Sequence, residues 1–321
     1  MTSPHTSRAT DLPTPTLRRR SVSQLLSYSQ CGEAFRLERR TDAPQRPAGW
    51  FYHGTAVHDT IEAWEKSGRT LTEEELNLKY LTAYRTLVND ALEEFDNNLG
   101  AFMTGGFKKA ESDLTDREEI GWYQIQDYVQ NALLMQDVWE VIDVEPRFDI
   151  VLGGVWLVGY IDQVVRSKVT KEIYPVDLKS GSKTPPAPVQ LAIYREALKV
   201  MYPHEVVADH AFWVHLGRPP SKTGKTKAKP TKWVEEDLTE WPPERVAVWL
   251  QDMDRSESEG IYLPSPTDGC DKVCGVAQYC RAMSWHLGSV KQYAPDAMFD
   301  PVKVEAGVEP DQQELPIEDA A

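Results

Sequence analysis

The sequence predicts an α/β protein in which a mixed central sheet is flanked by helices. Strand-like runs lie at about residues 144–152, 155–166 and 172–179 and are separated only by turns. A helical stretch at 188–201 then leads to an apolar run at about 206–215. Adjacent strands followed by a helix and a further strand are typical of a mixed sheet with helices packed on it.

Length and composition agree with one large domain. At roughly 100–200 residues per domain, 321 residues suit a single domain with insertions, and a hydrophobic share of 41% supplies its core. The formal net charge of −15 argues against a uniformly basic surface, although acids are needed at a metal site. No apolar run approaches the ~20 residues of a membrane span, and no hydrophobic stretch follows the N-terminal arginines. We therefore expect a cytoplasmic protein without membrane contact.

The two ends of the chain are expected to lie outside the folded domain. Residues 1–20 mix Ser, Thr and Pro with a terminal run of arginines, a composition typical of a disordered basic tail. Residues 289–321 are acidic and contain Pro, so we expect a second disordered tail there. The folded domain is then expected to span residues 21–288.

Helices are expected before the strands. Ser21 is followed three residues later by Gln24, a capping-box pattern that predicts a helix beginning at Ser21 and continuing toward Cys31. Gly54 is expected to turn the chain into a second helix, which carries His58. A lone helical histidine is more often structural than functional, so this residue gains weight only from acids elsewhere in the chain.

Longer helices are expected on either side of the strands. Two of them, at about 72–99 and 115–142, form a helical insertion over about 72–142. A last helix is expected at about 242–255, before the C-terminal cysteines.

The third expected strand carries an acid and a base on one face. Side chains alternate along a strand, so Asp177 and Lys179 project together while their neighbours face the core. An earlier apolar strand ends in a second acid, Asp162, and the following helix has Gln190 and Tyr194 one turn apart. An isolated Asp-x-Lys pair is more often a solvated ion pair, so the pattern depends on these neighbours.

Together with the histidine, these acids suit a hard cation. Asp162, Asp177 and the neutral imidazole of His58 would form a mixed oxygen and nitrogen shell for Mg²⁺ or Mn²⁺. Such a cation polarises a phosphate and lowers the pKa of a bound water. The residues therefore favour metal-assisted hydrolysis of a phosphodiester.

The four cysteines are unevenly placed, with Cys31 near the start and Cys270, Cys274 and Cys280 close together near the end. In a reducing compartment such a cluster holds metal more readily than disulfides. Four thiolates from an N-terminal helix and a C-terminal loop can hold Zn²⁺ as a Cys₄ site.

A basic segment lies between the expected strand at about 206–215 and a further strand expected at Trp233. The residues from Arg218 to Lys232 include six positive charges and no acid, which is typical of an exposed flexible loop. Because it could overhang a nucleic acid, we assign DNA contacts to Lys222, Lys225, Lys227 and Lys229. A solvated hairpin tip is the alternative.

Four motifs, taken in order, resemble the RecB-like branch of the PD-(D/E)XK nucleases. They are Gly54-x-x-x-His58, Gly159-x-x-Asp162, Asp177-x-Lys179 and Gln190-x-x-x-Tyr194. The resemblance covers roughly residues 21–288 and implies a restriction-endonuclease-like fold. It also implies that a Mg²⁺ or Mn²⁺ ion is held by His58, Asp162, Asp177 and the backbone carbonyl of Leu178.

The same resemblance implies roles for the other motif residues. Lys179 would position the attacking water or stabilise the transition state, while Gln190 and Tyr194 would orient the active site and the DNA.

The cysteines make the chain similar to the iron–sulfur subgroup, which includes CRISPR-associated exonucleases and the nuclease domain of AddB helicase–nucleases. That resemblance implies a [4Fe–4S] cluster formed by both ends of the domain, on Cys31, Cys270, Cys274 and Cys280. The last three follow a C-x3-C-x5-C spacing, one residue longer in its first gap than the usual C-x2-C-x5-C of the family. Zinc remains the alternative.

The function expected is that of a metal-dependent DNA exonuclease acting on DNA ends or single strands. It would serve recombination, repair or DNA processing, with a phage as one source and recombination proteins as partners. One alternative is a non-catalytic DNA-binding or scaffold module with a structural metal cluster, and another is a zinc-stabilised binding protein of a different fold.

Overall fold

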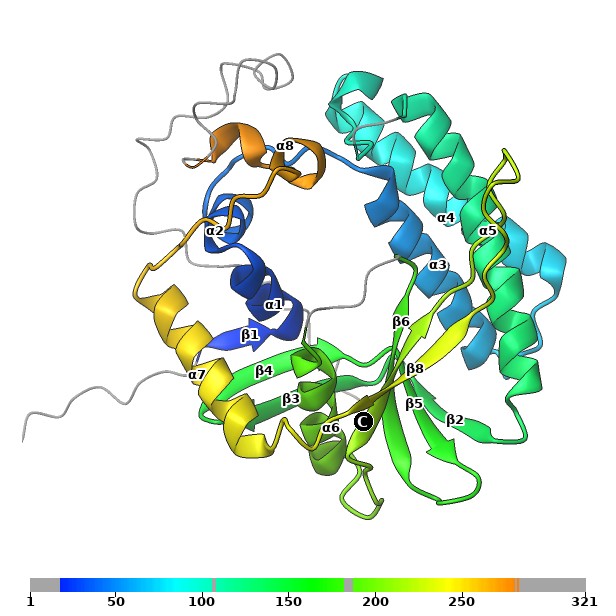
Figure 1. Cartoon of the computed structure of the whole chain (residues 1–321), viewed down its shortest axis with the longest axis vertical. Coiled ribbons are helices and arrows are strands. Elements are labelled where there is room, and N and C mark those ends of the chain that lie inside the picture. Colours follow the sequence, from blue (N-terminus) through cyan, green and yellow to red (C-terminus); the bar gives the residue numbers. More distant parts are fainter. Residues whose placement is uncertain (1–17, 106–107, 182–186, 281, 283–321) are drawn as a thin grey trace, which may run out of the picture.

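A five-stranded mixed sheet lies at the centre of the protein, with a three-stranded sheet beside it (Figure 1). The computed structural model describes residues 18–105, 108–181, 187–280 and 282. The strands of the large sheet are β2 (Trp139–Val144), β5 (Gln163–Ser167), β6 (Ile173–Lys179), β7 (His210–His215) and β8 (Lys232–Asp237). They lie in the order β2-β5-β6-β7-β8, in which β6 and β7 run parallel and the other neighbours antiparallel.

The small sheet joins the start of the described chain to its middle. Its strands are β1 (Arg19–Ser21), β3 (Arg147–Leu152) and β4 (Val155–Tyr160). Strand β4 lies between the other two, pairing parallel with β1 and antiparallel with β3.

Helices cover both faces of the large sheet (Figure 1). On one face lie α3 (Gly49–Lys66), α4 (Glu73–Glu94) and α5 (Ala110–Leu134), whose apolar residues pack against β5, β6 and β7. On the other face α6 (Val189–Met201) packs between the two sheets, and α7 (Pro243–Ser258) lies beside it. The predicted mixed α/β architecture is therefore confirmed.

The N-terminal helices meet the C-terminal segment at the edge of the fold (Figure 1). Helices α1 (Val22–Gln30) and α2 (Gly32–Arg40) are separated by Cys31, and α8 (Cys270–Val273) follows α7. Short 3-10 helices occupy Leu99–Ala101 and Ala277–Tyr279. The Ser21 capping box predicted for the first helix is confirmed, since its side chain accepts from the Gln24 amide.

Strand alternation divides β6 between the two faces, as the sequence predicts. Val176 and Leu178 are buried against the α3, α4 and α5 layer. Asp177 and Lys179 point to the opposite face, as does Trp213, which lies beside Asp177 on β7.

The prediction of a single strand at 155–166 is wrong. The chain leaves the small sheet after Tyr160 and enters the large sheet at Gln163, so two strands in different sheets replace it. Asp162 stands in the short connection between them. Both strands are largely apolar, so the composition gives no sign that the chain passes from one sheet to the other between them.

The expected boundaries before that point also need correction. The helix expected at 115–142 begins at Ala110 and ends at Leu134, and residues 139–144 form strand β2 instead. Trp139, Val141 and Ile142 lie in this strand, where their aromatic and β-branched side chains suit the pleated surface.

The folded chain begins earlier than Ser21. Arg19 and Arg20 belong to β1, which pairs with β4, so the tail expected over residues 1–20 is wrong for these two residues. Arg20 is buried and forms ion pairs with Asp254, at 2.6 Å, and Glu257 in α7. The rest of that tail up to residue 17, and the tail expected at 289–321, lie outside the described residues.

The turn expected at Gly54 is also wrong, because α3 already begins at Gly49 and Gly54 lies within it. Its missing side chain has a packing role, since a Cβ there would come within 3.3 Å of the Ser180 hydroxyl oxygen. Among the helices of the described residues, none is long and apolar enough to cross a membrane.

Candidate active site

Two acids and a histidine from three separate elements meet at the end of the large sheet. Asp162 precedes β5, Asp177 lies on β6, and His58 lies on α3. The Asp162 Oδ2 atom accepts the backbone amide of Leu178 at 2.6 Å and lies 3.6 Å from Nδ1 of His58. The structure thus brings the first three sequence motifs together.

Lys179 connects this group to the fourth motif. Its Nζ atom lies 2.6 Å from Oδ2 of Asp177 and donates to Oε1 of Gln190 at 3.4 Å. The amide nitrogen of Gln190 in turn donates to the Tyr194 hydroxyl at 2.8 Å. The ammonium also lies 4.7 Å from the ring centroid of Trp213, a cation–π contact that holds it over the sheet.

Glu145 is a site residue that sequence reasoning missed. Its carboxylate, the Asp162 carboxylate and the His58 imidazole each offer one ligand atom within 4.8 Å of the others. Glu145 occupies the turn between β2 and β3 with a φ of 53°, and its amide donates to the Asp162 carbonyl at 3.1 Å. In the sequence, Glu145 is visible only as an acid directly before Pro146 at the boundary of an expected strand. A pattern of helices and strands does not distinguish such an acid from other surface acids.

Burial leaves the acids of the site prone to hold protons. It raises the pKa of Asp162 to about 6, although the Leu178 amide and the Lys179 ammonium oppose the shift. Burial and then the nearby Asp162 charge raise the pKa of Asp177 to about 7 and that of Glu145 to about 8. Crowded carboxylates repel one another, so a cation is what would stabilise their ionised forms.

The imidazole of His58 complements these acids. Burial is the main cause that lowers its pKa, so the ring is neutral at neutral pH and can offer a lone pair. Carboxylate oxygens with one neutral imidazole suit Mg²⁺ or Mn²⁺ by ligand type. The residues present therefore fit a divalent cation.

The α5 layer holds the chain where it leaves β6. Gln124 of α5 is fully buried, and its amide nitrogen donates to the Ser180 carbonyl at 3.0 Å. Its amide oxygen faces Nε2 of His53 at 2.8 Å, and burial lowers the pKa of that histidine to about 4. A neutral His53 on α3 and Gln124 on α5 thus support the residue that follows Lys179.

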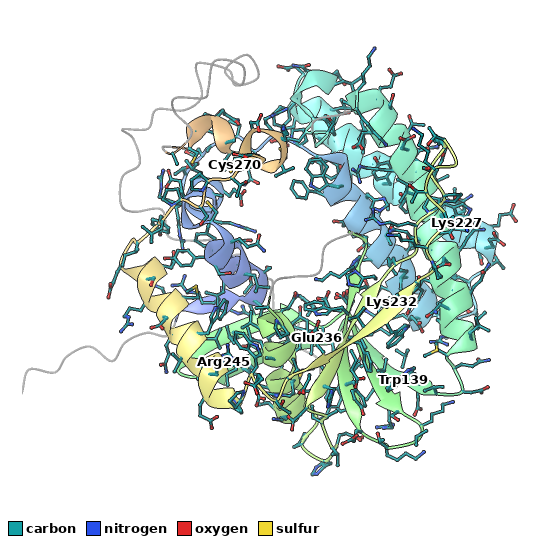
Figure 2. All side chains as sticks on the ribbon, viewed as in Figure 1. Trp139, Lys227, Lys232, Glu236, Arg245 and Cys270 are labelled. Carbon is teal, nitrogen blue, oxygen red and sulfur yellow. The ribbon has the colours of Figure 1, made fainter. Side chains whose placement is uncertain are left out.

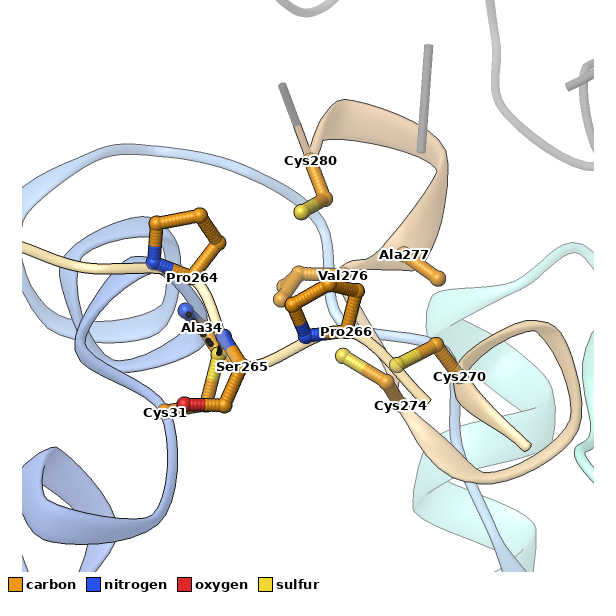
Figure 3. Close-up of a pocket in the computed structure, with 10 residues that line it drawn as sticks. All are labelled: Cys31, Ala34, Pro264, Ser265, Pro266, Cys270, Cys274, Val276, Ala277 and Cys280. Atoms are coloured by element: carbon orange, nitrogen blue, oxygen red, sulfur yellow. Dashed lines mark hydrogen bonds between the residues drawn. The ribbon is translucent and has the colours of Figure 1, made fainter. Parts of the chain in front are cut away.

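The four cysteines surround one small cavity of about 20 Å³ (Figure 3). The Cys31 sulfur accepts the backbone amides of Ala34 at 3.5 Å and Ser265 at 3.4 Å. The Cys270 sulfur accepts the amide of Thr267 at 3.2 Å. Burial raises the pKa of the Cys274 thiol to about 11.

Backbone contacts dock the C-terminal cysteine segment onto the N-terminal helices. The Glu33 amide donates to the Leu263 carbonyl at 3.3 Å, and the Arg46 amide donates to the Gly275 carbonyl at 3.0 Å. Gly32 has no room for a side chain, since a Cβ would lie 2.9 Å from the Leu263 nitrogen. The two ends of the domain are therefore joined by backbone hydrogen bonds.

The basic segment forms a hairpin beside α5 (Figure 1). Lys222 pairs with Asp116 at 2.7 Å and with Glu119 at 3.2 Å, both on α5. The other predicted DNA contacts, Lys225, Lys227 and Lys229, are exposed. Figure 2 shows Lys227 on this hairpin, where it crosses α5 in the view. The acids of α5 thus neutralise one of the four predicted contacts.

The fold and the arrangement of acids, histidine and lysine are those expected of an α/β nuclease. The model of the PD-(D/E)XK nuclease superfamily matches residues 19–281, and the chain belongs to that superfamily. The predicted family is confirmed, whereas the RecB-like branch and the iron–sulfur subgroup remain predictions. Nucleases of this superfamily use divalent metals, in agreement with the ligands gathered around Asp162.

Two phage proteins are similar over most of this chain. The Gene 69 protein of Mycobacterium phage D29 is 30% identical over 269 residues, covering 81% of this chain and 96% of that protein. The Gene 69 protein of Mycobacterium phage L5 is 27% identical over 288 residues, covering 81% and 95%. The crystal structure of SSO0001 aligns at 12% identity with a TM-score of 0.31, over 71% of this chain and 96% of that chain.

Proposed function

We propose that this protein is a metal-dependent DNA exonuclease that acts on DNA ends or single strands. The observation that carries the proposal is the meeting of a buried acid, a half-buried acid, a neutral imidazole and an ammonium at one end of the sheet. The similarity to two mycobacteriophage proteins supports a phage nuclease. Its proposed role is in recombination, repair or DNA processing.

His58, Asp162 and Asp177 would hold Mg²⁺ or Mn²⁺, with Glu145 and the Leu178 carbonyl as further ligands. The chemistry that such a cation supplies when bound is polarisation of the phosphate and a lower pKa for the attacking water. The raised carboxyl pKa values mean that these side chains must lose protons as the site becomes charged.

Lys179 is the residue that we assign to the attacking water or to the developing phosphate charge. Its ammonium has three donors, of which two point to Asp177 and Gln190. The remaining donor can meet a water or a phosphate oxygen. Gln190 and Tyr194 would then orient the ammonium, because their hydrogen bonds fix one of its partners.

The proposal is tested with end-labelled linear DNA, a closed circular DNA of the same sequence, and Mn²⁺ or Mg²⁺ with and without chelator. An exonuclease degrades the linear DNA in the presence of the ion and leaves the circle intact. The Lys179→Ala variant should lose cleavage while still binding the ion. Absence of cleavage by the wild-type protein, with DNA still bound, would favour the non-catalytic DNA-binding module instead.

We further propose that the cysteines bind a [4Fe–4S] cluster. In a tetrahedral zinc site the sulfurs lie only about 3.8 Å apart, given Zn–S distances of about 2.3 Å. In the described part of the chain, His58, Glu145 and Asp162 are the one set of three ligands found within 4.8 Å of one another. No three of the described cysteine sulfurs form such a set, which favours a larger inorganic group than one zinc ion.

Anaerobic purification tests that assignment. The protein should be brown and contain about four irons and four sulfides per chain. Colourless protein with one zinc per chain would establish the Cys₄ zinc site.

A further inference from the structure

A row of basic residues crosses the large sheet at the end where the candidate active site lies. Lys179 on β6 lies opposite His215 on β7, and His215 lies opposite Lys232 on β8. Residues directly opposite on neighbouring strands project from the same face. With strands about 4.8 Å apart, the row extends for roughly 10 Å from the ammonium of the proposed catalytic lysine.

The base of the β7–β8 hairpin places a fourth basic residue, Arg218, near His215 at the end of this row and near Arg117 of α5. The Arg218 amide donates to the Lys229 carbonyl at 2.7 Å, and the Lys229 amide donates back at 2.9 Å. This pairing fixes the backbone of Arg218 three residues after His215. Figure 2 shows Lys232 where the hairpin re-enters the sheet as β8.

The charges at this hairpin base differ from the charge nearer its tip. Lys222 is paired with Asp116 and Glu119, as described above. Arg218 and Lys232, by contrast, form no ion pair with any residue between 18 and 282 that the structure describes. Among the described residues, Arg218 and Lys232 next to the site thus lack the carboxylate partners that Lys222 has farther along the hairpin.

The basic residues also oppose one another electrostatically. Burial lowers the pKa of His215, and Lys179, Lys232 and Arg218 lower it further. Burial and the nearby Arg117 lower the pKa of Arg218. The repulsion among these basic groups decreases when an anion approaches them.

We propose that Lys179, His215, Lys232 and Arg218 form a track for the sugar–phosphate backbone of the DNA strand being cleaved, on the β8 side of the scissile bond. The inference rests on the proposed nuclease function. Successive phosphates of a strand rise by about 3.4 Å each, so a row of roughly 10 Å meets two or three of them. Contacts of this kind position the strand without reading its sequence.

The track is tested by the salt dependence of binding to a short single-stranded DNA. All proteins carry Asp177→Asn, so that cleavage does not interfere. Adding Lys232→Gln and Arg218→Gln should flatten the slope of log affinity against log salt by about 1.4, at about 0.7 per lost phosphate contact. The single Lys232→Gln variant should flatten this slope by about 0.7.

The matched control is the double variant Lys168→Gln and Lys171→Gln. It removes the same charge from two exposed lysines in the turn before β6, at the opposite end of that strand from Lys179. Its salt slope should equal that of the parent protein. Equal slopes in the control and in the Lys232→Gln variant, which changes an exposed residue, would overturn the track.

Cleavage by the protein without Asp177→Asn separates this inference from the function on which it rests. DNA cleavage together with an unchanged slope in the Lys232 and Arg218 variants would remove the track and leave the nuclease. Absence of cleavage would remove the nuclease, and the salt slopes would still decide whether the row contacts phosphates.

Discussion

The carboxylate cluster and the cysteine cluster each gather proposed metal ligands from distant parts of the chain, but they are held in different ways. The acids lie on or beside strands of the large sheet, and main-chain hydrogen bonds from Leu178 and Glu145 fix Asp162 in place. The cysteines lie on short helices and loops at the two ends of the domain. Their segments are joined by a few backbone contacts, such as that from Arg46 to Gly275.

This difference separates chemistry from stability. The large sheet and the α3 helix packed on it can hold His58, Asp162 and Asp177 in place before any cation binds. A change there should therefore affect cleavage and leave the fold intact. The cysteine segments join chain ends that are far apart in sequence, so loss of their metal should affect the fold first. Each prediction below tests one side of this comparison.

The largest effect is expected from Asp177→Asn. Cleavage should fall by at least about 100-fold. Asp177 is both a proposed ligand of the cation and the ion-pair partner of Lys179, so the substitution removes the charge needed for both. The fold should be retained and even stabilised above neutral pH, since burial makes the ionised Asp177 costly. Single-turnover cleavage and thermal unfolding at pH 8 measure the two effects. Wild-type cleavage by the variant would remove Asp177 from the reaction.

Cys31→Ser should show the opposite pattern. In the chain-entropy model, a crosslink between such distant residues stabilises by about 5 kcal/mol, which is an upper bound here. The variant should lose its iron, melt at a lower temperature and expose both chain ends to protease. Ser29→Ala, an exposed change in the preceding turn, is the control and should keep its iron. Full iron content in Cys31→Ser would contradict the four-cysteine assignment.

Glu145→Gln tests whether the missed acid belongs to the cation site. The affinity for Mn²⁺ should fall by about 10–100-fold, while saturating Mn²⁺ restores most of the cleavage. Glu140→Gln, which changes an exposed acid on β2, should bind Mn²⁺ as the parent does. Equal Mn²⁺ affinities for the two variants would exclude Glu145 as a ligand.

The pH dependence of stability and of Mn²⁺ affinity should test the carboxylate cluster. The pKa values of Asp162, Asp177 and Glu145, at about 6, 7 and 8, lie above their unfolded values. Metal-free protein should therefore lose stability as the pH rises from about 5 to 8, because the folded state holds these protons more tightly. Mn²⁺ affinity should rise over the same interval, since binding requires deprotonated ligands. A flat unfolding temperature across that interval would contradict the burial of these acids.

The smallest effect is expected at the hairpin tip. Replacing Lys222, Lys225, Lys227 and Lys229 with Gln should flatten the salt slope of DNA binding without changing cleavage at saturating DNA. The salt slope should change by less than the sum expected for four phosphate contacts at about 0.7 each, because Lys222 is already paired with acids of α5. An unchanged slope would identify the hairpin tip as a solvated loop.

Much of the site could be predicted because its motifs are local. Alternation along one strand places Asp177 and Lys179 on the same face, and helical spacing places Gln190 near Tyr194. Glu145 could not be found in this way, because its place depends on a turn between two sheets. The altered boundaries near Asp162 have the same origin, since an apolar run does not reveal where a chain changes sheets.

The sequence by itself determined the mixed α/β class, the order of the four motifs and the capping box at Ser21, because each depends on neighbours within a few residues. Only the tertiary structure decided that Arg20 belongs to the core, since its partners Asp254 and Glu257 come from the other end of the chain. It alone also decided that Glu145 joins His58 and Asp162, because that contact requires both sheets and α3 to be assembled.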